Sequence, residues 1–422
     1  MAIWKEYRIE EIADVVGGGT PSTKVPQYYG GNIPWLTPKD LTNYTNRFIA
    51  RGERNITQEG LSNSSARMVP KNTILLTSRA PIGYMAIAAN DVCTNQGFKS
   101  IVVNPKKADY NFVYYLLKAN MEYIKSYGTG TTFAEISASV VKNLKFNIPD
   151  LPTQTAIAEI LSSLDDKIEL NNKINQELEN LAQTLFKQWF IDFEFPNENG
   201  EPYKSSGGEM IDSELGEIPK GWEVYSMSDL LETVSKTYPL KTVVEVIFLN
   251  TGDIQDGKFL HTNISDPKTL PGQAKKSISI NDILYSEIRP TNKRFAFVHF
   301  DSSKYVVSTK LMVLRSKVEI NSLFQYFILT QKEQIEYLQR LAESRSGTFP
   351  QITFSEVSTI KIALPSFDKV NLFVENVLEP FFSSKFSSEF ENQELTNLRD
   401  TLLPKLISGE LEVSEALTQT TA

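Results

Sequence analysis

The sequence predicts an α+β protein in which two mixed α/β domains form a pseudo-two-fold repeat, separated by two long antiparallel coiled-coil helices. Three observations support this prediction. Residues 151–190 carry a heptad pattern, short motifs recur about 216 positions apart, and basic blocks alternate with acidic ones. A chain of 422 residues with 41% hydrophobic content has room for several folded domains.

The heptad pattern begins after Asp150 and Pro152, residue types typical of a helix N-terminus. Steps of four and three residues then select one stripe, held over four heptads. Its predicted seam contains Leu161, Leu164, Ile168, Asn171, Asn175, Leu178 and Leu185. The alternative is a long amphipathic helix packed on a globular domain. Unbroken heptads favour a coiled-coil partner, and buried seam asparagines require a polar group opposite them.

The repeat is visible as residues that recur at a nearly constant offset. Thr132-Phe133-x-x-Ile136 returns 216 positions later as Thr348-Phe349-x-x-Ile352, and the offset from Leu181–Leu185 to Leu398–Leu402 is 217. The predicted segments are a first domain (1–150), a first helix (151–190), a linker (191–221), a second domain (222–365), a second helix (366–410) and a polar tail (411–422).

Within each domain, strands and helices both have sequence signals. The predicted strands are Asn72–Ala89, Ser100–Val103, Leu144–Ile148 and Ile360–Leu364, and the predicted helices are Tyr110–Tyr127 and Ser322–Leu341. Mixed signals of this kind predict an α/β architecture for both domains.

The second long helix offers the partner that the first helix requires. Its apolar end carries Leu395, Leu398 and Leu402, and its middle is polar. Laid antiparallel, the two polar centres meet. We therefore expect Asn171 and Asn175 to face Ser384 and Ser388.

Charge divides the chain into four blocks. The net charge is +5 for residues 1–150, −10 for 151–218, +3 for 219–365 and −6 for 366–422. The basic excess of the domains is modest and is weak support for DNA binding when taken alone. A single cysteine, no apolar run near 18 residues and a charged N-terminus favour a reducing cytoplasmic location.

A search for catalytic chemistry finds no good candidate. Cys93 and the two histidines have no nucleophile or metal-ligand spacing, and Gly17-Gly18-Gly19 fits a turn with positive φ better than a phosphate loop. Asn32-Ile33-Pro34-Trp35 is close to the motif of adenine amino-methyltransferases, but lacks its first proline. Asp282 with Glu287-Ile288-Arg289 lacks the lysine expected of a nuclease.

Basic and aromatic side chains among polar loop residues suit phosphate and base-edge contacts. Each is individually more typical of a solvated surface charge. The candidate DNA-binding residues are Lys24, Tyr28, Lys39, Arg47, Arg51, Arg54, Arg79, Lys99, Lys275, Lys276, Arg289, Lys293, Arg294 and Lys310. Arg79 and Arg289 stand close to a proline, Pro81 or Pro290, at near-equivalent repeat positions, which favours one shared role, either phosphate binding or structural.

Several motifs together resemble the specificity subunits of type I restriction-modification enzymes. Beyond the repeat, the resemblance is carried by Ser78–Gly83, Gln188–Phe193, Gly216–Trp222 and Leu398–Gly409, and it covers nearly the whole chain. It implies that each domain is a target-recognition domain reading half of a split DNA target. It also implies that the helices are spacers that dock two methyltransferase subunits, with two restriction/translocase subunits added.

The resemblance further implies no catalytic residues and no metal in this chain, and places S-adenosylmethionine, ATP and Mg²⁺ on partner subunits. A helix of about 30–35 residues spans roughly 45–50 Å, or some 13–15 base pairs at about 3.4 Å each. Two rival functions stay open. One is a scaffolding coiled coil whose domains bind protein, and the other is a solitary methyltransferase.

Overall fold

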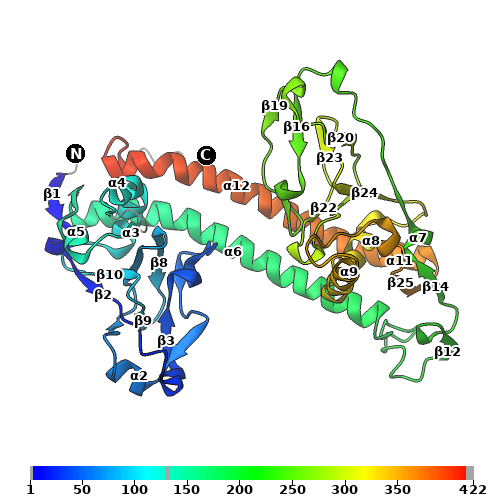
Figure 1. The fold of residues 1–422 in the computed structure, drawn as a ribbon, viewed down its shortest axis with the longest axis horizontal. Helices are drawn as coiled ribbons and strands as arrows, with labels where there is room; N and C mark the ends of the chain where they lie inside the picture. Colours follow the sequence, from blue (N-terminus) through cyan, green and yellow to red (C-terminus); the bar gives the residue numbers. More distant parts are fainter. Residues whose placement is uncertain (1–2, 130–133, 415–422) are drawn as a thin grey trace. The chain divides into compact units, whose positions relative to one another are not determined.

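The computed structural model describes residues 3–129 and 134–414, and the chain forms two compact units (Figure 1). Unit 1 comprises Met1–Ile174 and Ser388–Ala422, and unit 2 comprises Asn175–Ser387. Each unit thus combines one α/β domain with parts of both long helices. The two units do not test the division of the chain into six predicted segments, because each unit boundary falls inside a long helix and not between two segments. That division stays a prediction.

The domain of unit 1 is built on two main sheets. One has five strands in the order β2-β10-β7-β8-β4, and the other has four in the order β5-β3-β9-β6. A further pair, β1 with β11, lies outside them. The strands are β1 (Lys5–Arg8), β2 (Ala13–Gly17), β3 (Tyr29–Leu36), β4 (Phe48–Ile49), β5 (Arg54–Ile56), β6 (Met68–Val69), β7 (Ile74–Ser78), β8 (Ile82–Ala88), β9 (Val92–Thr94), β10 (Phe98–Val103) and β11 (Lys145–Ile148).

The domain of unit 2 repeats this topology. Its two main sheets have the orders β15-β24-β21-β22 and β19-β16-β23-β20, and β14 pairs with β25 as β1 pairs with β11. Each domain has a parallel pairing at the same place, β3 with β9 and β16 with β23, and the domain of unit 1 has a second one, β4 with β8. The strands are β12 (Met210–Ser213), β13 (Gly216–Pro219), β14 (Glu223–Ser226), β15 (Leu231–Thr233), β16 (Val246–Leu249), β17 (Ile254–Gln255), β18 (Lys258–Phe259), β19 (Ile264–Ser265), β20 (Ala274–Ser277), β21 (Ile283–Ser286), β22 (Phe295–Phe297), β23 (Tyr305–Ser308), β24 (Leu311–Ser316) and β25 (Lys361–Leu364).

The main helix of the unit 1 domain is buried on all sides, because α3 buries the six consecutive residues Phe112–Leu117. α3 begins where Asp109 accepts a hydrogen bond from the Phe112 N–H, a typical N-cap. The predicted helix Tyr110–Tyr127 is broken at Asn120, whose side chain donates to the Leu116 carbonyl and ends α3. The helices are α1 (Ile9–Ile12), η1 (Pro26–Tyr28), η2 (Pro38–Leu41), α2 (Gln58–Ser62), α3 (Tyr110–Ala119), α4 (Met121–Ser126) and α5 (Ala138–Asn143).

Unit 2 contains the same helix arrangement with similar interruptions. The predicted helix Ser322–Leu341 ends early at Thr330, where the Thr330 hydroxyl and the Gln331 side chain bond to carbonyls of the last turn. The helices are α7 (Met227–Leu230), η3 (Leu240–Thr242), η4 (Thr251–Asp253), η5 (Pro267–Thr269), η6 (Pro290–Asn292), α8 (Ser322–Leu329), α9 (Lys332–Arg345), α10 (Phe354–Val357), α11 (Phe367–Phe373), a π-helical turn (Val374–Leu378) and α12 (Glu379–Ser408).

The first long helix, α6 (Leu151–Phe190), has 40 residues and coincides with the heptad stretch. Asp150 begins it as predicted, because its carboxylate accepts from the Thr153 N–H at 3.0 Å, and this bonding lowers the Asp150 pKa. The second predicted helix is interrupted at Val374–Leu378 by a π-helical turn, after which α12 continues to Ser408.

Within unit 1, α6 and α12 run in opposite directions. Asn171 Nδ2 donates to Glu391 Oε2 at 2.7 Å and to Asn392 Oδ1 at 2.9 Å. Further toward the α6 N-terminus, Arg399 contacts Asp165 at 2.6 Å. The polar partner expected for Asn171 exists, but its identity was predicted wrongly. Ser384 and Ser388 lie one to two turns earlier in α12, because the helices are shifted along each other.

Asn175 belongs to unit 2, where its side chain is 8% exposed and its Oδ1 has no hydrogen-bond partner. The α6–α12 contact in this unit is instead an ion pair between Lys385 and Glu179, at 3.3 Å. The expected matching of Asn175 with a serine is therefore also wrong. Two long charged side chains fill this part of the contact.

The seam leucines and Ile168 occupy the expected side of the helices. Leu161, Leu164 and Leu402 are buried in the core of unit 1, against which Leu395 and Leu398 also pack. Leu178 and Leu185 pack on the core of unit 2, and Ile168 is half-buried. These positions share their apolar environment with the domains, as a helix packed on a globular domain does.

Two smaller predictions are corrected. Gly18 and Gly19 do not adopt positive φ. A Cβ at Gly18 would lie 2.0 Å from the Asn95 carbonyl oxygen, so close backbone approach explains the glycine. The predicted polar tail is also wrong at its start, because Leu411 and Val413 pack against the core of unit 1. Residues 415–422 lie outside the described part of the chain.

Candidate nucleic-acid interface

The loop after β7 in unit 1 holds Arg79 against a neighbouring segment. Arg79 Nη1 lies 3.6 Å from Glu135 Oε2, and the Ile136 N–H donates to the Ser78 carbonyl at 3.0 Å. The next residue of this loop, Ala80, has a left-handed φ of 52°, and the loop divides the predicted strand Asn72–Ala89 into β7 and β8. Ile136 is fully buried and anchors this contact.

The equivalent loop of unit 2 is built in the same way. Arg289 has a left-handed φ of 44°, and its Nη2 donates to the Thr348 carbonyl at 3.3 Å. The Ile352 N–H donates to the Glu287 carbonyl at 2.8 Å, and Ile352 is fully buried. Arg79 and Arg289 thus occupy corresponding loops. Thr132 and Phe133, the first-unit partners of Thr348 and Phe349 in the repeat, lie outside the described residues.

Both loops also receive a lysine. In unit 1, Lys99 Nζ lies 3.1 Å from Ser78 Oγ and 3.4 Å from Glu135. In unit 2, Lys310 Nζ lies 3.2 Å from Glu287 and 3.4 Å from Gln351. Glu135 and Gln351 each precede the buried isoleucine of their unit. A cation that braces the loop is therefore part of both domains.

Arg47 and Lys99 are too buried to serve as surface contacts. The Arg47 side chain is 5% exposed, and its guanidinium bonds to Tyr115, to the Ser162 carbonyl and to Asp166. The Lys99 side chain is 11% exposed. Both leave the set of candidate DNA contacts, because reaching a phosphate would expose the unpaired groups they now satisfy. No sequence pattern separates these two residues from their exposed neighbours.

The other unit 1 candidates lie on loops and edges. Lys24, Lys39, Arg51 and Arg54 are exposed, and Tyr28 is half-buried in η1. Lys39 pairs with Glu53 at 2.8 Å, whereas no ion pair within the described residues holds Arg51 or Arg54. Lys24, Arg51 and Arg54 are therefore the basic side chains of this set that are most available to a phosphate.

The unit 2 candidates are more often engaged. Lys276 donates to the Thr309 and Leu311 carbonyls, and its burial lowers the lysine pKa. Lys293 pairs with Asp256 at 3.3 Å, and Arg294 is half-buried. Lys275 is exposed in β20.

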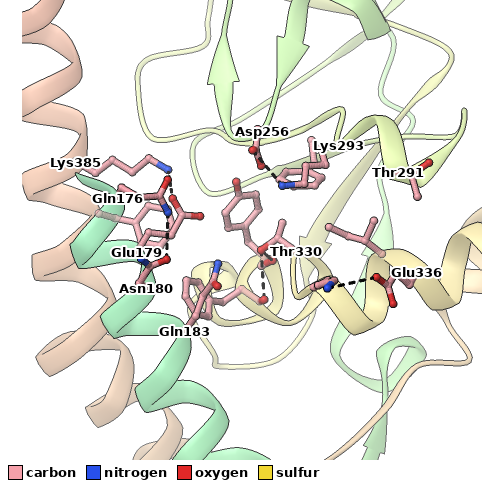
Figure 2. A pocket seen from close by; sticks show the side chains of 16 residues that line it. Gln176, Glu179, Asn180, Gln183, Asp256, Thr291, Lys293, Thr330, Glu336 and Lys385 are labelled. Atoms are coloured by element: carbon pink, nitrogen blue, oxygen red, sulfur yellow. Dashed lines mark hydrogen bonds and ion pairs between the residues drawn. The ribbon is translucent and has the colours of Figure 1, made fainter. Parts of the chain in front are cut away.

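A cavity of about 480 Å³ lies in unit 2 between α6, α12, α8 and the loops at 256 and 291–293. Figure 2 shows Lys385 and Glu179 on one side of it and the Asp256–Lys293 pair on another. The three lysines that line it, Lys293, Lys332 and Lys385, each pair with a carboxylate. Lys293 therefore faces this cavity as well as solvent.

The residues considered for catalysis have structural roles. Burial raises the pKa of Cys93 to about 11, so its thiol stays protonated. Trp35 is 4% exposed and donates to the Gly19 carbonyl, which leaves no free face to stack on a flipped base. Asp282 is fully buried and bonds to Arg315 at 2.7 and 2.9 Å. Among the described residues, no group of three or more His, Cys, Asp or Glu side chains is placed to hold a metal.

Sequence reasoning missed a polar cluster in unit 1. The Tyr115 hydroxyl donates to Asp165 at 2.6 Å and accepts from Arg47 at 3.0 Å, while Arg399 contacts the other oxygen of Asp165. Burial, assisted by the Asp165 charge, raises the pKa of Tyr115. The signal available in the sequence was an aspartate directly beside the seam residue Leu164.

Fold and site together define a duplicated α/β protein whose two domains present matching, lysine-braced arginine loops. The description "Type I restriction modification DNA specificity domain" belongs to the family model that matches residues 1–180 and 219–392. The chain belongs to this family. Membership confirms the predicted identity as a DNA-specificity component rather than a catalytic subunit.

Individual relatives agree. The chain is 36% identical over 422 residues to the type I restriction enzyme MjaIX specificity subunit of Methanocaldococcus jannaschii, covering 98% of this chain and 94% of that protein. It is 48% identical over 145 residues to the HindI specificity subunit of Haemophilus influenzae, covering 34% and 32%. The crystal structure of an S subunit from M. genitalium superposes with a TM-score of 0.59 at 16% identity, covering 96% of both chains, and supports the fold.

Within the described residues, no helix is both long and apolar enough to cross a membrane.

Proposed function

We propose that each α/β domain reads one half of a split DNA target for a type I restriction-modification complex. The observation that carries the proposal is the duplicated loop, with Arg79 and Lys99 in one unit and Arg289 and Lys310 in the other. Two copies of one recognition architecture are what two half-sites require. Arg51, Arg54 and Lys275 are the proposed phosphate contacts, since they are exposed and basic.

The helices are proposed to act as an antiparallel coiled-coil spacer that sets the gap between the half-sites. Support comes from the contacts that join α6 and α12 inside each unit. The acidic charge of both helices also supports it, because this charge disfavours close approach to DNA. Exposed apolar residues on these helices offer docking positions for two methyltransferase subunits. They are Leu170, Ile174, Leu181 and Phe390.

The remaining parts of the proposal concern the complex. Two restriction/translocase subunits would join the methyltransferase core in the cytoplasm. S-adenosylmethionine, ATP and Mg²⁺ would act on those partners, which supply methyl transfer and cleavage.

Methylome sequencing of a host that expresses this chain with its methyltransferase tests the split target. The expected result is one methylated motif with two defined halves and an unread gap. Inserting one heptad into α6 and one into α12 should lengthen the gap and leave both halves unchanged. A changed half-site at constant gap would contradict the spacer.

Phosphate contact is tested by the Arg51→Ala/Arg54→Ala variant in a gel shift of the methyltransferase complex. Binding should weaken on all sequences, and the slope of log affinity against log salt should fall by about two. Lys405→Ala, an exposed lysine near the end of α12, is the matched control. Unchanged DNA binding in the double variant would show that these arginines do not contact phosphates. Absence of DNA binding by the wild-type complex would favour the scaffolding function.

A further inference from the structure

Each unit holds one largely buried ion pair between α6 and α12, and the two pairs differ. A further pair in unit 1, Lys167–Glu391 at 3.3 Å, has both side chains 46% exposed and is left aside. In unit 1, Asp165 of α6 contacts Arg399 of α12 at 2.6 Å, with side chains 9% and 15% exposed. In unit 2, Glu179 of α6 contacts Lys385 of α12 at 3.3 Å, with side chains 35% and 10% exposed. Three of these four charged groups are therefore largely removed from water.

The repeat shows that neither pair has a charged counterpart in the other unit. Phe382 lies 217 positions after Asp165, and Arg399 lies 217 positions after Ala182, so Phe382 and Ala182 occupy these places in unit 2. Phe382 and Ala182 both belong to the core of that unit.

The pair of unit 2 is equally unmatched in unit 1. Lys385 lies 217 positions after Ile168, and Thr396 lies 217 positions after Glu179. Duplicated halves have thus acquired complementary charges at different levels of the same helix contact.

Duplication creates an alternative partner for each unit. The segment Asn175–Phe190 of α6 is the repeat counterpart of the last part of α12. A second copy of the chain could therefore present this segment to unit 1 in place of α12. In that exchanged arrangement Asp165 would face Ala182, and Glu179 would face Ile168.

We propose that the two ion pairs are pairing keys, which make unit 1 accept α12 through Asp165–Arg399 and unit 2 accept α6 through Lys385–Glu179. The exchanged arrangement leaves charged groups buried without a partner, and such groups are strongly unfavourable. Charged and polar residues beside helical seams select partners in the same way. The inference does not depend on DNA binding.

Neighbouring groups fit this role. Asp165 is fixed on the unit 1 side, because Tyr115 donates to its second oxygen at 2.6 Å. In unit 2, the Lys385 ammonium lies 5.9 Å from the centre of the Phe382 ring. Each key residue is therefore held in place by its own unit and presented to the incoming segment.

A cross-linking reporter in the full chain distinguishes the two arrangements. Asn171 contacts Asn392, which lies 217 positions after Asn175, so in the exchanged arrangement residue 171 of one copy faces residue 175 of the other. Residue 173 then faces the same region of the second copy. Lys173→Cys places an exposed thiol there, and the natural Cys93 is buried.

The test combines Lys173→Cys with neutral keys: Asp165→Asn, Arg399→Gln, Glu179→Gln and Lys385→Gln. Treated with a short bismaleimide, this variant should form at least about tenfold more cross-linked dimer than Lys173→Cys alone, a ratio equivalent to one decade in the pairing constant. The control adds Glu179→Lys and Lys385→Glu together to Lys173→Cys. This charge-reversed pair still joins opposite charges in unit 2, so the control should form as little cross-linked dimer as Lys173→Cys alone. Equal cross-linking of the neutral variant and the parent would overturn the proposal.

A second measurement covers the case in which the neutral variant does not fold. The full-chain single variants Glu179→Lys and Lys385→Glu each carry like charges at the key of unit 2. When co-expressed, the two chains should form a heterodimer in native mass spectrometry, since the lysine introduced at position 179 of one chain then meets the glutamate introduced at position 385 of the other, and the remaining wild-type Glu179 and Lys385 pair across the dimer as well. If the co-expressed chains show only the masses that each variant shows when expressed alone, with no heterodimer, the proposal is overturned.

Discussion

Units 1 and 2 pack equivalent helices against each other, but the contact is polar in unit 1 and apolar in unit 2. Tyr115 and Phe327 each lie six residues after the N-cap of an equivalent helix, α3 or α8. In unit 1, Tyr115 meets Asp165 in a hydrogen-bonded cluster, whereas in unit 2 Phe327 meets Phe382 among aromatic rings. A shared arrangement of strands and helices thus accommodates a polar or an apolar contact, provided that the buried polar groups find partners.

The difference has energetic consequences. The rings around Phe186 lie at centroid distances of 5.3 to 5.6 Å, so this contact depends on apolar burial and close packing. The unit 1 contact depends on mutual satisfaction of Arg47, Tyr115, Asp165 and Arg399. Removal of one member should therefore lower the free energy of unfolding by more than the contribution of its own hydrogen bond, because its partners are left buried and unpaired.

The largest expected effect is in the aromatic contact. Phe186→Ala should lower the free energy of unfolding by about 4 kcal/mol, because the side chain is 1% exposed and its removal leaves a cavity. Urea unfolding followed by tryptophan fluorescence measures this. The repeat counterpart Leu403→Ala, a smaller side chain at 7% exposure, is the matched control and should cost about 2–3 kcal/mol. Equal losses would show that the two contacts do not differ in packing.

Arg399→Ala should be next, at about 3 kcal/mol, because it leaves the Asp165 charge buried without its cation. The same unfolding measurement applies. Replacement of Asp165 together with Arg399 by apolar residues should recover much of this loss, since an apolar contact at this place already exists in unit 2. A double variant as unstable as the single one would contradict that equivalence.

Tyr115→Phe removes only the hydroxyl that joins Asp165 to Arg47 and should cost about 1–2 kcal/mol. Phenylalanine fits the backbone here, because Phe327 occupies the corresponding site. Tyr110→Phe is a useful comparison, since the Tyr110 hydroxyl takes part in no hydrogen bond within the described residues and its loss should be nearly neutral. A cost for Tyr115→Phe equal to that of Tyr110→Phe would argue against a cooperative polar cluster.

The smallest effect concerns pH and unit 2. His299 stacks on Phe386 with centroids 3.3 Å apart, and burial lowers the His299 pKa below its usual value. The unfolded chain therefore binds a proton that the folded chain resists. Stability is fully present above the unfolded pKa of about 6.5 and decreases as pH falls toward the lowered folded pKa. His299→Gln should flatten this part of the stability-versus-pH curve, measured by urea unfolding at a series of pH values.

Much of the fold was accessible from local sequence patterns. The heptad stretch predicted the bounds of α6, and the last strand of each domain was placed within one residue, because period and capping are local properties. The duplicated topology also followed, since repeat-related residues such as Ile136 and Ile352 occupy equivalent anchors. Helix breaks at Asn120 and Thr330 were missed, because side chains there bond to the backbone of the preceding turn.

The candidate site was less predictable. Exposed Arg51 and Arg54 and buried Arg47 look alike in sequence, and only the position of Asp166 and Tyr115 separates them. The shared position of Arg79 and Arg289 was predictable from the repeat, but the lysines that brace their loops come from other parts of the domains, Lys99 from β10 and Lys310 from the turn before β24.

The sequence by itself determined the duplication, the long helix α6 and the family, because repeats, heptads and motifs are carried by residue order alone. Tertiary structure decided which charges meet. The burial of Arg47 depends on how the first domain packs on α6. The partner of Asn171 and the contrast between Asp165–Arg399 and Phe382–Ala182 depend on the axial shift between α6 and α12. That shift is set by the fit of whole apolar faces within each unit, a collective property that no single heptad position encodes.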